Sequence, residues 1–227
     1  MPRSTDHGVG TRRRRLVAAT FALVLGLGGA SMVGYALEHQ QVAPQPSLTV
    51  AAPGAALAPA LPAAPLRTPV LPASAPTSIH IPAINVSSPV NSVGLNPDHT
   101  LEVPQPGPLY NQAAWYRYSP APGEIGPSVI VGHIDSAKEG PSVFFKLGAL
   151  KPGQRIEVGR ADGTTAAFEV DSVASFPKHS FPSRTVYGDT DFAALRLITC
   201  GGSFDRSTGN YIDNIVVFAH LLAPVPI

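Results

Sequence analysis

Two strand-like runs flank a single cysteine in the segment ALRLITCGGSFDRSTGNYIDNIVVFAHL, Ala194–Leu221. The first run, Leu195–Thr199, leads directly into Cys200, and the second, Asn214–Leu221, is rich in β-branched residues. The dipeptide Gly201–Gly202 follows the thiol, and such a pair is typical of a sharp turn or of a close approach to the backbone. The pattern predicts that Cys200 lies at the end of a strand beside a flexible rim.

The composition of the chain excludes several kinds of partner and site. It has 16 Lys+Arg against 15 Asp+Glu, a balance that favours neither nucleic acid nor a strongly acidic partner. A single cysteine excludes an intramolecular disulfide and a thiolate-rich zinc site. Asp189 and Asp191 alone are too few for a calcium site. We therefore expect no metal and no cofactor.

The N-terminal part of the chain has the pattern of a membrane anchor. Residues 1–15 form a polar, basic tail, whereas residues 16–37 are uncharged and mostly Leu, Val, Ala and Gly. As a helix, the second segment would span about 33 Å, enough to cross a bilayer. A cleaved signal peptide is the alternative, because small residues occur at positions 28–31, although signal peptides have shorter apolar runs of ~7–15 residues. The preceding arginines predict a single-pass protein of the cell membrane, with a cytoplasmic N-terminus and an extracellular remainder.

Residues 38–76 are dominated by Ala, Pro, Ser and Leu. The prolines recur too closely for a helix or strand to persist. We interpret this segment as a linker, either disordered or polyproline-like, that at ~3.1 Å per residue reaches up to about 100 Å. Such a spacer suits a protein that works within a thick wall.

A globular domain is predicted over residues 77–227. Short β-rich runs between Pro and Gly turns predict strands at Ser78–Ile81, Asn85–Val90, Leu101–Val103, Ser128–His133, Arg155–Val158, Thr165–Phe176, Ala194–Thr199 and Asn214–Leu221. Asp162–Gly163 indicates a hairpin, Phe144–Leu150 indicates one helical turn, and Trp115 and Tyr116 are expected in the core. Because helical periodicity is almost absent, we predict an all-β fold, a closed β-barrel of about eight strands with short helical turns.

A reactive Cys200 would need a partner that favours its thiolate or shares its proton. The alternative is a small buried hydrophobe, which is the common fate of a lone cysteine. Among the seven histidines, His133 ends a predicted strand, as Cys200 ends another. A histidine alone at such a position is usually structural. Together with a cysteine in the same kind of position, it indicates a nucleophile and an acid–base group.

These residues lie in motifs that resemble those of sortases. IVGHID, Ile130–Asp135, is similar to the histidine strand of that family, and LITCGG, Leu197–Gly202, is similar to its TLxTC signature. Gly140–Val158 resembles the segment after the sortase histidine, and the pattern ITCGGSFD…Y..DN resembles the actinobacterial class F branch. The resemblance covers about residues 78–221.

The resemblance implies a membrane-anchored cysteine transpeptidase that acts on secreted proteins. Cys200 would attack the Thr–Gly carbonyl of an LPxTG-type sorting signal, and a cell-wall precursor amine would release the thioacyl intermediate. His133 would protonate the leaving amine and deprotonate the incoming one. A noncatalytic wall-associated β-domain with a structural cysteine and a hydrolytic cysteine peptidase remain alternatives.

The resemblance also implies an arginine that holds the substrate or its oxyanion. Sortases usually place it at the start of the final strand, where this chain has Ile212–Asn214. We therefore expect Arg206 in this role, with Asn214 as a polar stand-in, because Arg196 lies roughly 13 Å back along its strand. Thr199 and the loop residues Phe181, Val186 and Tyr187 are expected to bind the substrate.

Overall fold

The structure, a computed structural model, describes residues 42–46 and 69–223. The predicted anchor at residues 16–37 and most of the predicted linker lie outside these residues. Within the described part of the chain, no helix is long and apolar enough to cross a membrane.

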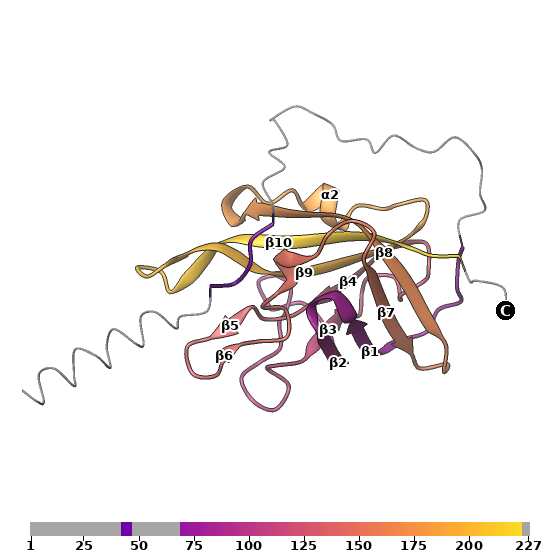
Figure 1. Cartoon of the computed structure of the whole chain (residues 1–227), viewed down its shortest axis with the longest axis horizontal. Coiled ribbons are helices and arrows are strands. Elements are labelled where there is room, and N and C mark those ends of the chain that lie inside the picture. The colour runs from indigo at the N-terminus through magenta and orange to yellow at the C-terminus, as the bar shows by residue number, and fades with distance from the viewer. Residues whose placement is uncertain (1–41, 47–68, 224–227) are drawn as a thin grey trace, which may run out of the picture. The chain divides into compact units, whose positions relative to one another are not determined.

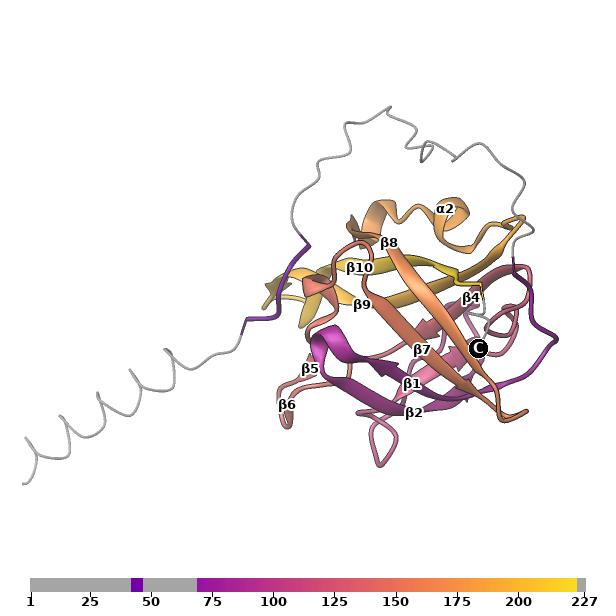
Figure 2. The ribbon, with the colours of Figure 1, turned by 45° about the vertical axis from the view of Figure 1, so that its right-hand side comes forward.

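The described chain folds into a barrel of eight strands (Figures 1 and 2). The strands are β1 Pro76–Ile81, β2 Val86–Val93, β3 Ala113–Tyr116, β4 Gly126–Val131, β7 Arg155–Arg160, β8 Thr165–Pro177, β9 Ala193–Asp205 and β10 Asn210–Leu221. They close in the order β1-β2-β3-β4-β9-β10-β8-β7. The pairs β2–β3 and β4–β9 are parallel, and the other neighbouring pairs are antiparallel. The predicted all-β closed barrel is confirmed.

Short elements connect these strands. β5 Asp135–Ser136 and β6 Gly140–Pro141 pair as a separate two-stranded sheet. The helical turns are η1 Pro82–Ile84, η2 Leu147–Ala149, η3 Lys178–Ser180 and α2 Ser183–Tyr187. η2 lies within the predicted helical turn. The predicted hairpin joins β7 to β8, where Gly163 has a φ of +81°.

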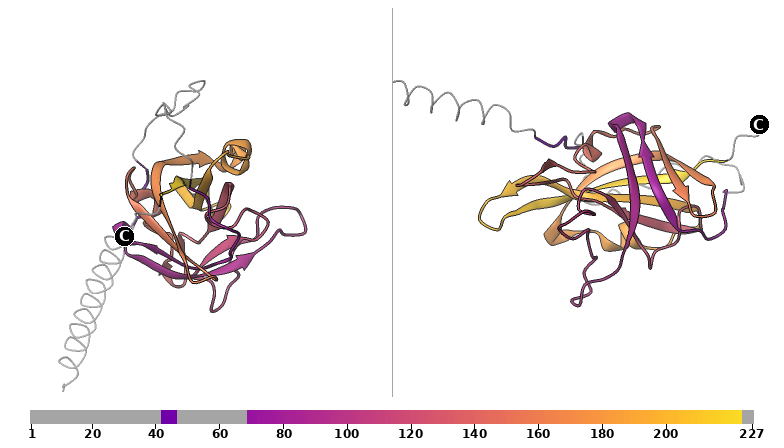
Figure 3. Two further views of the ribbon diagram at one scale, coloured as in Figure 1. Left: turned by 90° about the vertical axis from the view of Figure 1, so that its right-hand side faces the viewer. Right: turned by 90° about the horizontal axis from the view of Figure 1, so that it is seen from below.

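Alternation along β9 divides its side chains between two hydrophobic clusters. Leu195 and Leu197 belong to the core cluster, whose other large members include Ile79, Phe144, Ile156, Phe168 and Val217. Ile198, on the opposite face of β9, packs with Val186 of α2 and with Val216 of β10. Figure 3 shows α2 outside the ring of strands. The β8–β9 connection therefore covers the outer face of the strand that carries Cys200.

The third barrel strand differs from the prediction. Leu101–Val103 is not a strand, because Leu101 forms only a single bridge, with Leu95. A Pro-rich turn follows at once, and proline cannot donate a hydrogen bond to a ladder. Ala113–Tyr116 forms β3 instead, and Trp115 and Tyr116 are half-buried within it.

The predicted strand ends at Cys200 and His133 are both corrected. β4 ends at Val131, two residues before His133, whereas β9 continues past Cys200 to Asp205. The β9–β10 register shifts opposite Ile212, and Gly202 there has a φ of +72°. A glycine in this conformation accommodates an extra residue as a β-bulge, so the ladder resumes beyond the thiol. The resulting hairpin projects beyond the barrel in Figure 1.

Replacing Gly202 with alanine should destabilise the protein more than replacing Gly209 in the same hairpin. Both glycines have positive φ, at +72° and +68°. A Cβ on Gly202 would lie 2.5 Å from Asp213 Oδ2, whereas a Cβ on Gly209 would meet nothing within 4 Å. We expect a loss of about 1 kcal/mol for Gly209→Ala and about 2–3 kcal/mol for Gly202→Ala in urea unfolding. Equal losses would show that the contact with Asp213 imposes no constraint.

Two parts of the predicted linker are described, and both contact the barrel. In the part just before β1, Ala75 O accepts a hydrogen bond from Ala161 N (2.8 Å), and Leu71 N donates to Gly123 O (2.8 Å). In the other part, Ala43–Pro46 lies at the site described below. The remainder of the predicted linker lies outside the described residues.

Candidate active site

The parallel pairing of β4 with β9 brings His133 and Cys200 together. Val131 pairs with Ile198, and Gly132 N continues the ladder by donating to Ile198 O (3.1 Å). His133 and Cys200 each follow that pair by two residues on adjacent segments, which in parallel sheets lie about 4.8 Å apart. Ile134 and Cys200 pack in the same small hydrophobic cluster. Two residues that are distant in sequence thus occupy one site.

The imidazole of His133 is held by two contacts. Its ring stacks on Tyr110, with centroids 4.1 Å apart and an interplanar angle of 11°. Its Nε2 lies 2.8 Å from Pro104 O, and because a carbonyl oxygen only accepts hydrogen bonds, Nε2 carries the hydrogen. In the neutral ring, Nδ1 is therefore the nitrogen that exchanges a proton. Sequence reasoning missed both contacts, since Tyr110 and Pro104 lie in an irregular connection.

Two tyrosines hold Asp135, two residues beyond His133. The hydroxyl of Tyr110 donates to Asp135 O (3.0 Å), and that of Tyr211 donates to Asp135 Oδ2 (2.5 Å). Burial, followed by the hydrogen bond to Asp135, raises the pKa of Tyr211 well above its ordinary value. Burial also raises the pKa of Tyr110, with smaller contributions from Asp135 and Cys200. Both phenols therefore remain protonated donors at neutral pH.

A lysine lies against the thiol. Lys178 Nζ is 3.6 Å from Cys200 Sγ. Lys178 directly follows β8, whose last residue, Pro177, pairs with Asp213 of β10. Lys178 was not among the site residues predicted from the sequence. The barrel order β9-β10-β8 brings it to the cysteine.

The residues predicted to assist Cys200 differ in how close they lie to the thiol. Asn214 is its cross-strand partner on β10, so the two side chains share one face about 5 Å apart. Arg206 is exposed in the turn of the hairpin, ~20 Å along the strand direction. Within the described chain, Arg206 forms no hydrogen bond or ion pair with the groups around the thiol. Thr199 faces away from Cys200 and is 3% exposed, and its hydroxyl has no partner among the described residues.

The predicted loop residues form one aromatic and aliphatic cluster. Phe181 lies edge-on to Phe176 (6.1 Å between centroids) and tilted against Tyr187 (5.9 Å). Val186 is fully buried beneath them, whereas Tyr187 is 39% exposed. Phe176 pairs with Asn214, which pairs with Cys200, so the cluster begins in the same cross-strand row as the thiol. Of the predicted loop residues, Phe181 and Tyr187 are accessible from outside, and Val186 is not.

The short segment Ala43–Pro46 contacts the other side of the site. Gly202 N donates to the side-chain oxygen of Gln45 (2.8 Å). Ala43 is buried and packs with Ile134 and Phe145 in the cluster that Cys200 also contacts. A segment upstream of the barrel therefore reaches the residues next to the nucleophile candidate.

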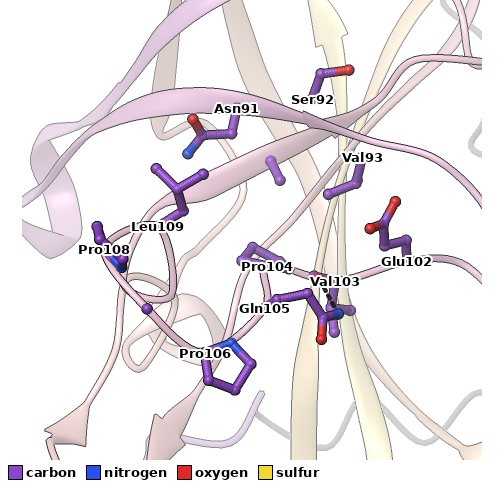
Figure 4. Close-up of a pocket in the computed structure, with 12 residues that line it drawn as sticks. Asn91, Ser92, Val93, Glu102, Val103, Pro104, Gln105, Pro106, Pro108 and Leu109 are labelled. Atoms are coloured by element: carbon purple, nitrogen blue, oxygen red, sulfur yellow. Dashed lines mark hydrogen bonds between the residues drawn. The ribbon is translucent and has the colours of Figure 1, made fainter.

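A pocket of about 270 Å³ lies next to Pro104 (Figure 4). The end of β2 forms one wall, and the turn at residues 102–109 forms the other. Pro104, whose carbonyl holds His133, is part of this wall. Apart from the Pro-rich turn itself, no sequence pattern indicated this pocket.

Comparison with known proteins identifies the family. The model of the family described as Sortase domain matches residues 79–222. The chain belongs to the sortase family. The resemblance seen in the motifs around His133 and Cys200 is thus confirmed at the level of the family, whose members are cysteine transpeptidases.

Solved sortase structures are similar to this one. Sortase A from Corynebacterium diphtheriae has 21% identity and a TM-score of 0.49, and the match covers 68% of this chain and 63% of that one. Sortase C-1 from Actinomyces oris has 21% identity and a TM-score of 0.48, covering 66% and 73%. A Clostridium perfringens sortase D5 transpeptidase has 19% identity and a TM-score of 0.48, covering 66% and 79%. No curated protein matches this chain.

Proposed function

We propose that this sortase is a membrane-anchored transpeptidase, of the class F type, in which Cys200 is the nucleophile and His133 is the acid–base group. The observation that carries the proposal is their placement on adjacent parallel segments within a sortase domain. Acyl transfer requires a nucleophile, a proton carrier and a positive or polar donor at one point. Cys200, His133 and Asn214 supply these groups.

The reaction proceeds through a thioacyl intermediate. The thiolate of Cys200 forms a bond to the Thr carbonyl carbon of an LPxTG-type signal, and the carbonyl electron pair moves to oxygen. Collapse of this adduct breaks the C–N bond, and His133 gives its proton to the departing glycine amine. An incoming amine of a cell-wall precursor attacks the thioester and loses a proton to His133. The secreted protein becomes joined to that amine, and the thiolate is restored.

The contacts of His133 suit this exchange. Since Nε2 donates to Pro104 O, Nδ1 carries the proton that is given and taken. Stacking on Tyr110 fixes the ring plane, and a positioned ring transfers a proton more effectively than a mobile one.

The substrate peptide would lie over the β8–β9 connection. Phe181 and Tyr187 offer an apolar surface to the Leu-Pro portion, with Val186 as its support, and Asn214 offers a hydrogen-bonding amide beside the thiol. The buried position of Thr199 favours a role in strand packing over one in peptide contact. We further propose that the segment at residues 16–37 anchors the chain in the cell membrane, with the barrel outside the cell.

Adding an amine to the reaction separates the candidate functions. The protein is incubated with a labelled LPxTG peptide, with and without hydroxylamine, and the products are identified by their masses in mass spectrometry. A transpeptidase cleaves between Thr and Gly and converts the acyl group to the hydroxamate when hydroxylamine is present. A peptidase yields the free acid under both conditions. A noncatalytic domain leaves the peptide intact, and either of the last two outcomes rejects the proposal.

A further inference from the structure

Among the described residues, one cation lies next to Cys200 without an ion-pair partner. Lys178 Nζ lies 3.6 Å from Sγ. Three ion pairs involve other residues, so among the described residues no carboxylate neutralises Lys178. Its ammonium is the charged group that faces the sulfur.

We infer that Lys178 supplies the positive charge at the nucleophile, in the place where the sequence motifs led us to expect Arg206. The inference rests on the proposed role of Cys200 as the nucleophile. A cation in contact with sulfur favours the thiolate over the thiol, and the thiolate is the reactive form. Because Lys178 touches the reacting atom, it acts as a catalytic residue.

The barrel order explains why a lysine from β8 can reach the thiol. Cys200 of β9 pairs with Asn214 of β10, and Asn214 pairs with Phe176 of β8. Lys178 comes directly after Pro177, the last residue of β8. To reach Cys200 on β9, its side chain has to extend past one residue of the intervening strand β10. Asn214 has a short side chain, and lysine has a flexible four-carbon stem that spans such a gap.

Arg206 lacks the same access. It lies in the exposed turn beyond the end of β9, ~20 Å from the cysteine along the strand. The bulge at Gly202 keeps β9 and β10 paired out to Asp205 and Asn210, which holds that turn away from the thiol.

Other titratable groups lie around the thiol. They come from the connection after β4, from the β2–β3 connection, from β10 and from β5, and they are His133, Tyr110, Tyr211 and Asp135. Both tyrosines stay neutral at the pH of the test below, since their pKa values are raised. Of the groups from packed elements, Lys178 is the one that contributes a fixed positive charge.

The test is the rate at which iodoacetamide alkylates Cys200 at pH 7, measured in the full protein and in Lys178→Met. Alkylation forms an S–C bond and releases iodide, and it requires no peptide substrate. We expect alkylation of Lys178→Met to be about three- to tenfold slower, because the sulfur loses the cation beside it. Added salt should narrow the difference, because Lys178 is exposed.

Three further variants identify the source of the charge. Lys178→Arg should keep the wild-type rate of alkylation. Arg206→Met should also keep it, as should Lys151→Met, which removes an exposed lysine from a distant turn. A rate in Lys178→Met equal to that of the wild type, or a slower rate in Arg206→Met, overturns the inference.

The inference and the proposed function fail separately. Peptide transfer by Lys178→Met should fall by at least the same factor as alkylation. Slower alkylation of Lys178→Met in a protein that transfers no peptide would uphold the Lys178–Cys200 pairing and reject the transpeptidase. Normal peptide transfer together with an unchanged alkylation rate would do the reverse.

Discussion

Cys200→Ala is expected to abolish peptide transfer, with a loss of at least about 10⁴-fold in kcat/KM. The variant removes the atom that forms the thioacyl bond, and no other cysteine exists in the chain to replace it. Losses of this size or larger are usual when a covalent nucleophile is removed. The measurement is the initial rate of hydroxamate formation from the LPxTG peptide.

A second variant at the same position separates chemistry from packing. Cys200 packs in a small cluster with Ile134 and Phe145, so its replacement could also disturb the fold. Cys200→Ser keeps nearly the same volume and should unfold at the same urea concentration as the wild type, yet it should be as inactive as the alanine variant. Turnover at the wild-type rate in either variant would end the assignment of Cys200 as nucleophile.

The sequence was most informative where structure depends on local pattern. Alternating apolar residues and turn glycines located most strands and the β7–β8 hairpin. The paired Gly201–Gly202 also marked a close approach to the backbone, since Ile215 and Asp213 now crowd the two positions. These features depend on neighbouring residues alone, and a single sequence contains them.

The parts that were missed depend on strand order or on irregular backbone. Lys178 is far from Cys200 in sequence, and only the neighbour relation of β9, β10 and β8 brings them together. The stacking of Tyr110 on His133 involves a connection with no repeating pattern. The continuation of β9 past Cys200 required a bulge, whereas two consecutive glycines more often indicate the end of a strand. The hydrophobic periodicity of one segment does not show which other segment lies beside it in the fold.

His133 could be identified from the sequence, whereas its contact partners could not. His133 and Cys200 each lie in a short sequence motif that is typical of sortases, whereas Pro104 contributes only a backbone carbonyl. A carbonyl is present at every residue and gives no sequence signal. Its effect on the tautomer of His133 can be deduced only from the 2.8 Å contact.

His133→Ala is expected to lower kcat/KM for transfer by about 10³-fold, a smaller loss than that of Cys200→Ala. General acid–base catalysis contributes roughly 10²–10⁴-fold, and the thiol remains in place. An amine leaves less readily than the Cys200 thiolate unless it is protonated. The loss should therefore fall mainly on formation of the thioacyl intermediate, the step that expels the amine. A peptide thioester that requires no protonation of its leaving group should therefore recover much of the rate.

His220→Ala is the matched control for this variant. His220 is also on the barrel, but it pairs with Ala194 at the opposite end of β9, and its Nδ1 is hydrogen-bonded to Asp171 Oδ1 (2.6 Å). It should leave transfer unchanged. Equal losses in the two variants, or a failure of the thioester to recover the rate in His133→Ala, would show that His133 supports the fold and does not carry the proton. Recovery by the thioester alone would place the proton transfer at His133, because the thioester differs from the peptide only in what its leaving group requires.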